Sequence, residues 1–295
     1  MAVCWLDGVI VPADQAKVSV FDHGVLYGDG VFEGIRFYQR QAFRLDAHLR
    51  RLQDSARAIK LNLPYTHAEL EAAIFSVVQA FDQDDGYLRL VITRGQGSLG
   101  INPVSCERGT AFIIADKLSV LDPRLKNQGV KLIIASTRRL PPDGLDPRVK
   151  SLNYLNHVLA RIEANEAGAD EAILLNAQGH IAEGSADNVF IVRDETLLTP
   201  PVSDGALAGI TRGVIMTLSA ELGLQCTECS LSAYDLYTAD ECFLTGTGLE
   251  LMPVREIDGR GLAACPGPVF QRLSRAFAET IQTEVKHTRL QQAAS

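Results

Sequence analysis

No apolar run in this sequence is long enough to cross a membrane. The 295 residues are 46% hydrophobic, but polar or charged residues interrupt every apolar stretch before the roughly 20 residues that a spanning helix needs. The start, MAVCWLDGVIVPAD, has no basic segment followed by a long apolar one, and Asp7 comes early, which argues against a signal peptide. We therefore expect a cytoplasmic protein with no membrane partner.

An excess of positive charge is also absent. Lys and Arg total 28 against 36 Asp and Glu, which gives a formal net charge of −8. A general nucleic-acid-binding protein usually carries a basic surface, so this balance argues against nucleic acid as a partner. It is still compatible with a local basic pocket for a small anion.

The six cysteines do not form a disulfide framework, because they are scattered along a chain of this size. A reducing compartment fits such a pattern better than secretion does. Cys226 and Cys229 form a CxxC pair, but no second ligand pair and no thioredoxin-like context accompany it. We interpret the pair as incidental and expect no metal site.

Internal repeats and low-complexity tracts are missing too. The chain reads as a mixture of helices and strands without regular βαβ alternation, which predicts an α+β fold, and its length allows two domains. The polar stretch KLSVLDPRLKNQG is the candidate connection between them. We expect a small N-terminal domain at 1–117, a connection at 118–126 and a large domain at 127–295.

Hydrophobic periodicity places the individual elements. Asp46 is the expected N-cap of a helix whose apolar residues Leu49, Leu52, Ala56 and Ile59 recur at helical spacing. The other expected helices are HAELEAAIFSVVQAF (67–81), LNYLNHVLARIEANEAG (152–168), one entered from the loop GALAGITRG, and PVFQRLSRAFAETIQTEV (268–285). The expected strands are KVSVFDH (17–23), VFEGIRFY (31–38), YLRLVITRG (87–95), AFIIAD (111–116), VKLIIAST (130–137), EAILLN (171–176), NVFIVRD (188–194) and DECFLTGTG (240–248), with a hairpin at AQGHIAEGS.

A lysine in the stretch RVKSLNYLN raises a question of chemistry. Lys150 is expected at the start of a helix, where a positive charge is mildly unfavourable against the helix dipole. Tyr154 follows at i+4, so the two side chains would share one helical face. Lys150 is either an ordinary solvated lysine or one retained for its amine. Tyr154 either packs in the core or offers its hydroxyl to a ligand.

Two glycine-rich loops have the composition of phosphate-binding loops. The glycines of GALAGITRG allow close backbone approach, and Ile210 and Thr211 would open a helix whose first N–H groups bind an anion. In TGTG at 245–248, Thr247 offers a hydroxyl and an N–H. Either loop alone is more often only a turn.

Two charged residues complete the set of candidates. Arg51 in HLRRL lies beside the apolar stripe of its helix, and is either a surface arginine or a guanidinium that binds a phosphate through forked hydrogen bonds. Glu183 in EGSADN is expected in a turn, where it either caps the turn or holds a proton on a ring nitrogen. A Schiff-base lysine, a carboxylate, a tyrosine hydroxyl and phosphate donors are together what pyridoxal phosphate needs.

The sequence resembles the fold-type IV pyridoxal-phosphate aminotransferases, and among them the branched-chain amino acid aminotransferases. The matching motifs are FDHGVLYGDGVFEGIRFY, HLRRLQDSA, YLRLVITRG, PPDGLDPRVKSLNYLN, AEGSADNVF, GITRG and FLTGTGLELMPV, which run in family order from residue 21 to residue 254. The resemblance implies a small α/β domain, a larger domain with a mixed, barrel-like sheet, and pyridoxal 5′-phosphate at the domain interface. It also implies a homodimer or a higher homo-oligomer.

The same resemblance implies a role for each matching residue. Lys150 would bond the cofactor aldehyde and move the substrate proton, while Glu183 would pair with the ring nitrogen, Tyr154 with the ring hydroxyl and Leu207 with the ring face. The implied cofactor contacts are Arg51, Lys150, Tyr154, Glu183, Leu207, Ile210, Thr211, Gly246 and Thr247. The implied substrate contacts are Tyr27, Phe32, Arg36, Tyr87, Arg89, Gly248 and Leu249.

Two departures from the family patterns bear on specificity. The usual GTA turn is GTG here, so Gly248 keeps its N–H but loosens the turn. The D-amino acid branch carries an arginine and a histidine after TRG, where this chain has Leu99 and Ile101. The motifs therefore favour amino transfer from leucine, isoleucine or valine to 2-oxoglutarate by a ping-pong mechanism. The alternatives are a D-amino acid or R-amine transaminase, an aminodeoxychorismate lyase, and a non-catalytic binding protein on the same fold.

Overall fold

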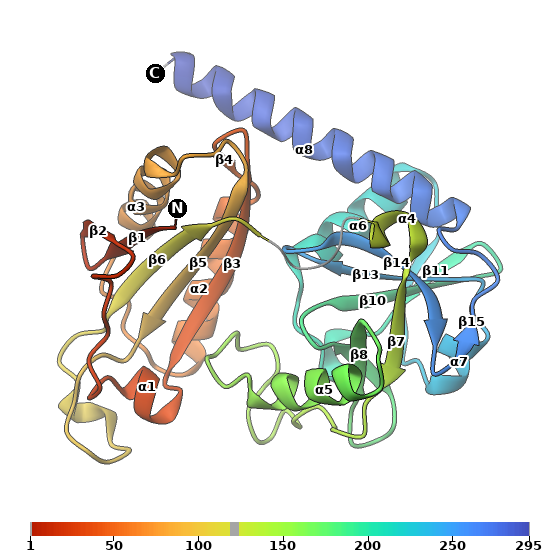
Figure 1. Ribbon diagram of the computed structural model, residues 1–295, viewed down its shortest axis with the longest axis horizontal. Helices are drawn as coiled ribbons and strands as arrows, with labels where there is room; N and C mark the ends of the chain where they lie inside the picture. The colour runs from red at the N-terminus through yellow and green to blue at the C-terminus, as the bar shows by residue number, and fades with distance from the viewer. Residues whose placement is uncertain (1, 119–123, 295) are drawn as a thin grey trace. The chain divides into compact units, whose positions relative to one another are not determined.

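The computed structural model describes residues 2–118 and 124–294 (Figure 1). Its contacts group into two compact units: unit 1 comprises Met1–Leu118, Val149–Asn153 and Ile281–Ser295, and unit 2 comprises Ser119–Arg148 and Tyr154–Thr280. The short segment Val149–Asn153 therefore belongs with unit 1, although the chain on both sides of it belongs to unit 2. The expected domain limits stay a prediction, and residues 119–123 of the expected connection lie outside the described residues.

Unit 1 is built on an antiparallel sheet. Across the described residues of this unit, the sheet has six strands in the order β2-β1-β6-β5-β3-β4. The strands are β1 (Val3–Leu6), β2 (Val9–Pro12), β3 (Gly30–Tyr38), β4 (Gln41–Ala42), β5 (Gly86–Thr93) and β6 (Ala111–Asp116). The helices are α1 (His23–Tyr27), α2 (Leu45–Ala58) and α3 (His67–Ala80). The strands expected at 31–38, 87–95 and 111–116 and the helix expected at 67–81 are confirmed within a few residues.

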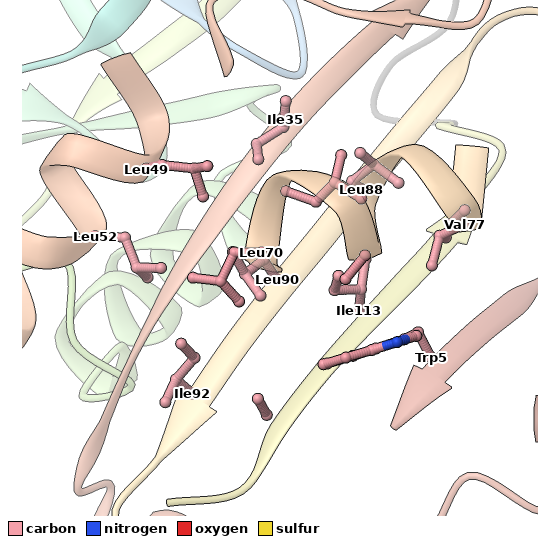
Figure 2. Close-up of a cluster of buried hydrophobic side chains, with 14 of the residues drawn as sticks. Trp5, Ile35, Leu49, Leu52, Leu70, Val77, Leu88, Leu90, Ile92 and Ile113 are labelled. Atoms are coloured by element: carbon pink, nitrogen blue, oxygen red, sulfur yellow. The ribbon is translucent and has the colours of Figure 1, made fainter. Parts of the chain in front are cut away.

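Alternation along the strands gives this sheet a core face. Val31, Ile35 and Phe37 of β3 are fully buried, as the two-residue period of a strand requires. They meet side chains from β5, α2 and α3 in one hydrophobic cluster (Figure 2). Each large apolar side chain buried in this way contributes about 1.5–3 kcal/mol. The intervening residues of β3, Phe32 and Arg36 among them, point to the opposite face.

Unit 2 is built on a mixed sheet that curls on itself. Across its described residues the sheet has nine strands, in the order β12-β11-β10-β13-β14-β7-β8-β9, with β15 paired to β14. β7 runs parallel to β14 and to β8, β12 runs parallel to β11, and the other pairs are antiparallel. Because β9 also contacts β10, the sheet bends back toward itself. This architecture confirms the expected α+β fold class.

Unit 2 contains the expected elements in the expected order, together with several that the sequence patterns did not predict. The strands are β7 (Val130–Ile134), β8 (Glu171–Leu175), β9 (Ile181–Gly184), β10 (Asn188–Arg193), β11 (Thr196–Thr199), β12 (Cys226–Glu228), β13 (Glu241–Gly246), β14 (Glu250–Ile257) and β15 (Arg260–Gly261). The helices are α4 (Leu125–Gln128), α5 (Leu155–Glu166), α6 (Ile210–Glu221), α7 (Ala233–Tyr237) and α8 (Pro268–Ala294), the last of which continues into unit 1. None of the helices in the described part of the chain has the length and apolar content to cross a membrane.

A partly exposed contact of α5 shows how unit 2 holds a helix against the sheet. Glu163 accepts hydrogen bonds from the N–H and hydroxyl groups of Ser136 and Thr137, just after β7. Burial alone would raise the pKa of Glu163, but these four hydrogen bonds lower that pKa to about 2. The carboxylate therefore stays ionised and fastens the middle of α5 to the end of a central strand.

The stretch KVSVFDH is not a strand, which corrects the prediction from its alternating pattern. Phe21 is 50% exposed, and Asp22 forms only an isolated bridge with Gln96. Asp22 instead accepts a hydrogen bond from the Gly24 N–H and caps α1. Alternation indicates a strand only where a neighbouring strand continues the ladder.

Asp46 is not the N-cap of α2, which is a second correction. The helix begins at Leu45, after Arg44, whose backbone is left-handed with φ 54°. Asp46 lies inside the first turn and pairs with Arg50. An acidic residue is favourable in the first turn as well as at the cap, because both lie at the positive end of the helix dipole. The residue type alone therefore did not define the first residue of the helix.

Lys150 does not begin a helix, and it shares no helical face with Tyr154, which is a third correction. α5 begins after Tyr154, and the residues before it run beside β3. The Phe32 N–H donates to the carbonyl of Lys150 at 3.0 Å, and the Leu152 N–H donates to the carbonyl of Gly30 at 2.9 Å. Backbone groups that a helix would pair internally are paired with the edge of β3 instead.

Replacement of the core residue Phe37 by alanine should destabilise unit 1 strongly. Its ring is fully buried and packs edge-to-face on Phe81, with the ring centroids 5.8 Å apart. Loss of a buried phenylalanine ring typically costs about 3–5 kcal/mol. Urea unfolding should show a loss of this size for Phe37→Ala. The matched variant Phe75→Ala removes a ring that is 49% exposed and should cost under about 1 kcal/mol. Equal losses would contradict the assignment of Phe37 to the core.

Candidate functional site

Lys150 is held at both of its backbone groups within unit 1. Its carbonyl accepts the Phe32 N–H of β3, and its own N–H donates to Oγ of Ser55 on α2 at 3.1 Å. The side chain is partly buried, and Nζ lies 4.5 Å from the centroid of the Phe32 ring, within the range of a cation–π contact. A solvated surface lysine needs no such anchoring, so the contacts favour a lysine retained for its amine.

Two glycines make room for the segment that carries this lysine. A Cβ on Gly30 would lie 2.7 Å from Cδ1 of Leu152, and one on Gly28 would lie 2.9 Å from Oδ1 of Asn153. Non-bonded carbon atoms stay about 3.5 Å apart or more. Gly28 also ends α1 in the left-handed conformation, with φ 69°, which favours glycine. The YGDG stretch is therefore needed for the segment to lie against β3.

Four side chains expected near the substrate lie on one face of the unit 1 sheet. Arg36 of β3 pairs directly with Tyr87 of β5, so both point to the same side as Phe32 and Arg89, which lie further along the two strands. The guanidinium carbon of Arg89 lies 4.5 Å from the centroid of the Phe32 ring and 5.8 Å from that of Tyr87. The structure thus brings together an aromatic and cationic face, next to the amine of Lys150.

Gly34 leaves room on this face for the Tyr87 ring, because it has no side chain. It lies between Phe32 and Arg36 on β3, and a Cβ there would be only 1.9 Å from Oη of Tyr87. The phenol of Tyr87 therefore lies directly across the glycine. Any larger residue at this position would displace the ring.

Tyr27 lies at the C-terminal end of α1. Its Oη accepts the Gly100 N–H at 2.7 Å, and its ring packs edge-to-face on His23 with the centroids 5.0 Å apart. The hydrogen bond to Gly100 fastens α1 to the loop that carries Leu99 and Ile101. Both of those loop side chains are exposed.

Arg51 is bound by a buried carboxylate. Its Nε and Nη2 each donate to one oxygen of Glu33 at 2.7 Å, and Nδ1 of His48 lies 2.7 Å from the same carboxylate. Burial alone would raise the pKa of Glu33, but the charges and hydrogen bonds of Arg51 and His48 lower that pKa to about 2. Burial lowers the pKa of His48, against the opposing effect of the Glu33 carboxylate.

Glu183 is a buried residue of β9 rather than of a turn, which corrects the expectation from its small neighbours. The strand continues through Gly184, so the small residues lie at its end. One carboxylate oxygen accepts the Leu207 N–H at 2.8 Å, and the other lies 3.1 Å from Nε of Arg139. The charge of Glu183 is thereby balanced by a buried arginine.

The loop before α6 is fixed by Glu183 on one side and by Asn188 on the other. Nδ2 of Asn188 donates to the carbonyl of Leu207 at 3.0 Å, and a Cβ on Gly209 would lie 1.9 Å from Oδ1 of Asn188. α6 begins at Ile210, as expected, and Gly209 offers no side chain to cap its first N–H groups. A helix N-terminus of this kind binds anions through its N–H groups and its dipole.

The second glycine-rich stretch begins with the last two residues of β13 and continues into the turn after it. A Cβ on Gly246 would lie 2.3 Å from Oδ1 of Asp187, so only glycine fits there. Thr247 is partly buried, whereas Leu249 lies in the hydrophobic core of unit 2 and would reach a substrate only through its backbone. Among the described side chains, Oγ1 of Thr245 is buried without a hydrogen-bond partner. A buried hydroxyl of this kind next to a turn favours a polar ligand nearby.

Two further expected residues lie near element ends. Tyr154 directly precedes α5 and is partly buried, and its ring stacks on His157 with the centroids 4.4 Å apart and the planes at 19°. Gly248 is partly buried in the turn between β13 and β14.

Residues that sequence reasoning missed hold the expected ones in place; they are Glu33, His48, Ser55, Arg139 and Asn188. Glu33 had a sequence signal, because a carboxylate inside an apolar strand is rarely buried without a partner. His48 precedes Arg51 by three residues and so shares its side of the helix. The other three have no comparable signal, because their partners lie far along the chain.

The chemistry of these groups fits a phosphorylated aldehyde with a basic ring nitrogen. An anchored lysine amine bonds an aldehyde, a buried carboxylate favours a proton on a ring nitrogen, and an uncapped helix start binds a phosphate. Leu207 ties Glu183 to the start of α6, so the last two features belong to one rigid part of unit 2. No group of three or more His, Cys, Asp or Glu in the described residues is placed to hold a metal ion.

Comparison with known proteins identifies the class. The family model for amino-transferase class IV matches residues 30–257, and the chain belongs to this family. The matched range includes Lys150, Glu183 and both glycine-rich loops. The resemblance drawn from the motifs is therefore confirmed.

Particular relatives are similar along almost their whole length. A putative branched-chain-amino-acid aminotransferase of Methanocaldococcus jannaschii is 50% identical over 256 residues, covering 87% of this chain and 88% of that protein. The crystal structure of a branched-chain aminotransferase from Thermoproteus uzoniensis with norvaline has a TM-score of 0.89 at 38% identity, covering 95% of this chain and 94% of that one. The branched-chain amino acid aminotransferase from Thermobaculum terrenum, in its PLP-form (holo-form), has a TM-score of 0.85 at 31% identity, covering 95% and 93%.

The Glu33 carboxylate should stabilise the fold in a pH-dependent way. Its pKa is about 2 in the folded protein against an ordinary 4.5, so its contribution is complete above the ordinary value and is lost as the pH falls toward the lower one. The difference in unfolding free energy between wild type and Glu33→Gln should shrink by about 2 kcal/mol between about pH 6 and pH 3. Urea unfolding at both pH values measures it, with Glu71→Gln, which removes an exposed carboxylate, as the control. A difference that does not change with pH would contradict the assignment.

Proposed function

We propose that this protein transfers the amino group of leucine, isoleucine or valine to 2-oxoglutarate, giving the branched 2-oxo acid and L-glutamate. The observation that carries the proposal is the anchored Lys150, whose amine lies beside an aromatic and cationic face. Apolar substrate side chains fit the rings of that face, and an acidic side chain fits its arginines. The relatives named as branched-chain aminotransferases support the same reaction.

The cofactor of this reaction is pyridoxal 5′-phosphate. When bound, it supplies the aldehyde that takes up the amino group and the ring that draws electron density from the substrate Cα. Lys150 would bond the aldehyde, Glu183 would keep the ring nitrogen protonated, Tyr154 would bind the ring hydroxyl and Leu207 would cover one ring face. The phosphate contacts are Arg51, Ile210, Thr211, Gly246 and Thr247.

Lys150 is the catalytic base in this proposal. Once the substrate amino group has displaced it from the aldehyde, Nζ would remove the proton from Cα of the bound amino acid, while the backbone N–H groups of Thr247 and Gly248 would bind the α-carboxylate. Ser55 and Phe32 hold the lysine backbone, so the amine moves only by rotation of its own side chain. Such anchoring keeps the reacting groups in a productive geometry. Two half-reactions alternate at the one lysine, so the kinetics are ping-pong.

Substrate selection follows from the face on β3 and β5. Phe32 and Tyr87 contact the branched side chain, and a difference of one methylene changes binding by only roughly 1–3 kcal/mol. Leucine, isoleucine and valine are therefore all accepted. Arg89 binds the second carboxylate of glutamate, with Arg36 as the second candidate. Tyr27 and Leu249 complete the proposed substrate contacts.

We also propose a cytoplasmic homodimer or higher homo-oligomer, with a small domain at 1–117 and a large one at 127–295. On α5, the apolar side chains spaced i, i+3, i+4 and i+7 are exposed; they are Leu155, Val158, Leu159 and Ile162. A stripe of this kind supports a protein interface. All six cysteines are free, which is compatible with a reducing compartment.

Replacement of Lys150 by alanine should abolish turnover of L-leucine with 2-oxoglutarate. General acid–base catalysis alone is worth roughly 10²–10⁴-fold, and the covalent contribution is lost with it. A coupled assay of glutamate formation measures the loss, and Lys17→Ala, at an exposed lysine, is the matched control with unchanged turnover. The wild-type cofactor absorbance band should shift with L-leucine and stay unchanged with D-alanine. Turnover by Lys150→Ala, or a shift only with D-alanine, would overturn the proposal.

Replacement of Arg89 by alanine should weaken use of the acidic substrate selectively. A lost charge-assisted hydrogen bond typically corresponds to roughly 10- to 100-fold. The kcat/KM for 2-oxoglutarate should therefore fall by that factor, while the value for L-leucine changes only a few-fold. Arg108→Ala, which removes an arginine that packs on Tyr65 instead, should change neither. Equal losses for both substrates would remove Arg89 from this role.

A further inference from the structure

We propose that Glu33 and His48 are positioning residues that hold the Arg51 guanidinium in the orientation that binds the cofactor phosphate. The inference rests on the proposed function and deepens it. That function gives Arg51 a phosphate contact. It gives no role to Glu33 and His48, which are buried beside Arg51 and hydrogen-bonded to each other.

The carboxylate of Glu33 sets the plane of the guanidinium. Each of its oxygens accepts one hydrogen bond from Arg51, from Nε and from Nη2, both at 2.7 Å. A forked pair of this kind fixes the orientation of a planar group, whereas a single hydrogen bond lets it rotate. A guanidinium has five N–H donors, and this carboxylate takes two of them along one edge. The other N–H groups of the Arg51 guanidinium are thereby held in one fixed direction.

His48 in turn fixes the carboxylate. Its Nδ1 lies 2.7 Å from Oε2 of Glu33, and the two side chains are 1% and 0% exposed. Because Glu33 is ionised, Nδ1 must be the donor. The imidazole thus adds a further hydrogen bond to the carboxylate that Arg51 also binds. The network therefore balances the negative charge of Glu33 with the positive charge of Arg51. The Arg51 side chain is 12% exposed, so it reaches the edge of the buried region.

The spacing along α2 connects this network to the catalytic lysine. His48, Arg51 and Ser55 follow one another at i, i+3 and i+7, which places them on one side of the helix. Ser55 accepts the N–H of Lys150. One helical face thus holds the arginine and the lysine at a fixed separation, which a cofactor bound at both ends requires.

A counter-charge role for Glu33 predicts the opposite result. A carboxylate beside Arg51 cancels part of its positive charge and so reduces its attraction for a phosphate dianion. If Glu33 only cancelled charge, its removal would strengthen phosphate binding. If Glu33 positions the guanidinium, its removal weakens phosphate binding. The sign of the effect separates the two roles.

The test compares two ligands that differ only in the phosphate. Full-length protein freed of cofactor is titrated with pyridoxal phosphate and with pyridoxal, and the absorbance band of each bound ligand gives its Kd. In Glu33→Gln, the Kd for pyridoxal phosphate should rise about tenfold or more, whereas that for pyridoxal should change less than about threefold. The control Asp46→Asn removes a carboxylate that pairs with Arg50 on the same helix but is exposed to solvent, and it should change neither Kd.

A second pair of variants gives an independent readout if Glu33→Gln does not fold. His48→Leu removes the donor to the carboxylate and should weaken pyridoxal phosphate binding several-fold. His48→Asn places an amide nitrogen near the position of Nδ1 and should restore the wild-type Kd to within about threefold. The same pyridoxal titration reports any loss that does not depend on the phosphate.

Four outcomes would overturn the inference. Tighter binding of pyridoxal phosphate by Glu33→Gln would mean a counter-charge role, and an equal loss for both ligands would mean a purely structural one. Wild-type Kd values for both ligands in the Glu33 and His48 variants, with normal binding by the wild type, would remove the positioning role alone. Failure of the wild type to bind pyridoxal phosphate would instead overturn the proposed function and this inference with it.

Discussion

The pairing of Val149–Asn153 with the edge of β3 is the constraint on which the candidate site depends. β4 is only two residues long and pairs with the far end of β3, so the near end is open to another segment. An open strand edge accepts such a segment readily. The Lys150 segment is therefore held to β3 by backbone hydrogen bonds, the Ser55 hydroxyl adds a side-chain bond to the lysine N–H, and the glycines at 28 and 30 keep the approach open.

The side chains of strand β3 alternate between two different environments. Glu33 lies on the core side, where it meets α2, whereas Phe32 and Arg36 lie on the side that carries the aromatic and cationic groups. Because side chains alternate with a period of two, a shift of one residue in the pairing with β5 would exchange the two sets. The long antiparallel register with β5, from Gly30 to Phe37, makes such a shift costly.

Local patterns predicted much of this molecule, and their failures have a common physical cause. The buried residues of α3 recur at helical spacing, burial alternates along β6 and the first half of β5, and β3 is a nearly continuous buried run. The predictions of a strand at KVSVFDH and of a helix start at Lys150 were wrong, because the conformation of both segments is set by partners distant in the chain. Arg139 and Asn188 were not predicted for the same reason. Arg139 contacts Glu183 and Asn188 contacts Leu207, and no local spacing in the sequence indicates either contact.

The contact between Gly34 and Tyr87 has a consequence for how this face can change over time. A methyl group at position 34 collides with the phenol oxygen, so a larger residue there is accepted only after Tyr87 has become smaller or moved. The reverse order carries no such clash. Substitutions that reshape the face must therefore occur in one order, with the change on β5 before the change on β3. The glycine at position 34 is retained as long as the Tyr87 side chain lies across it.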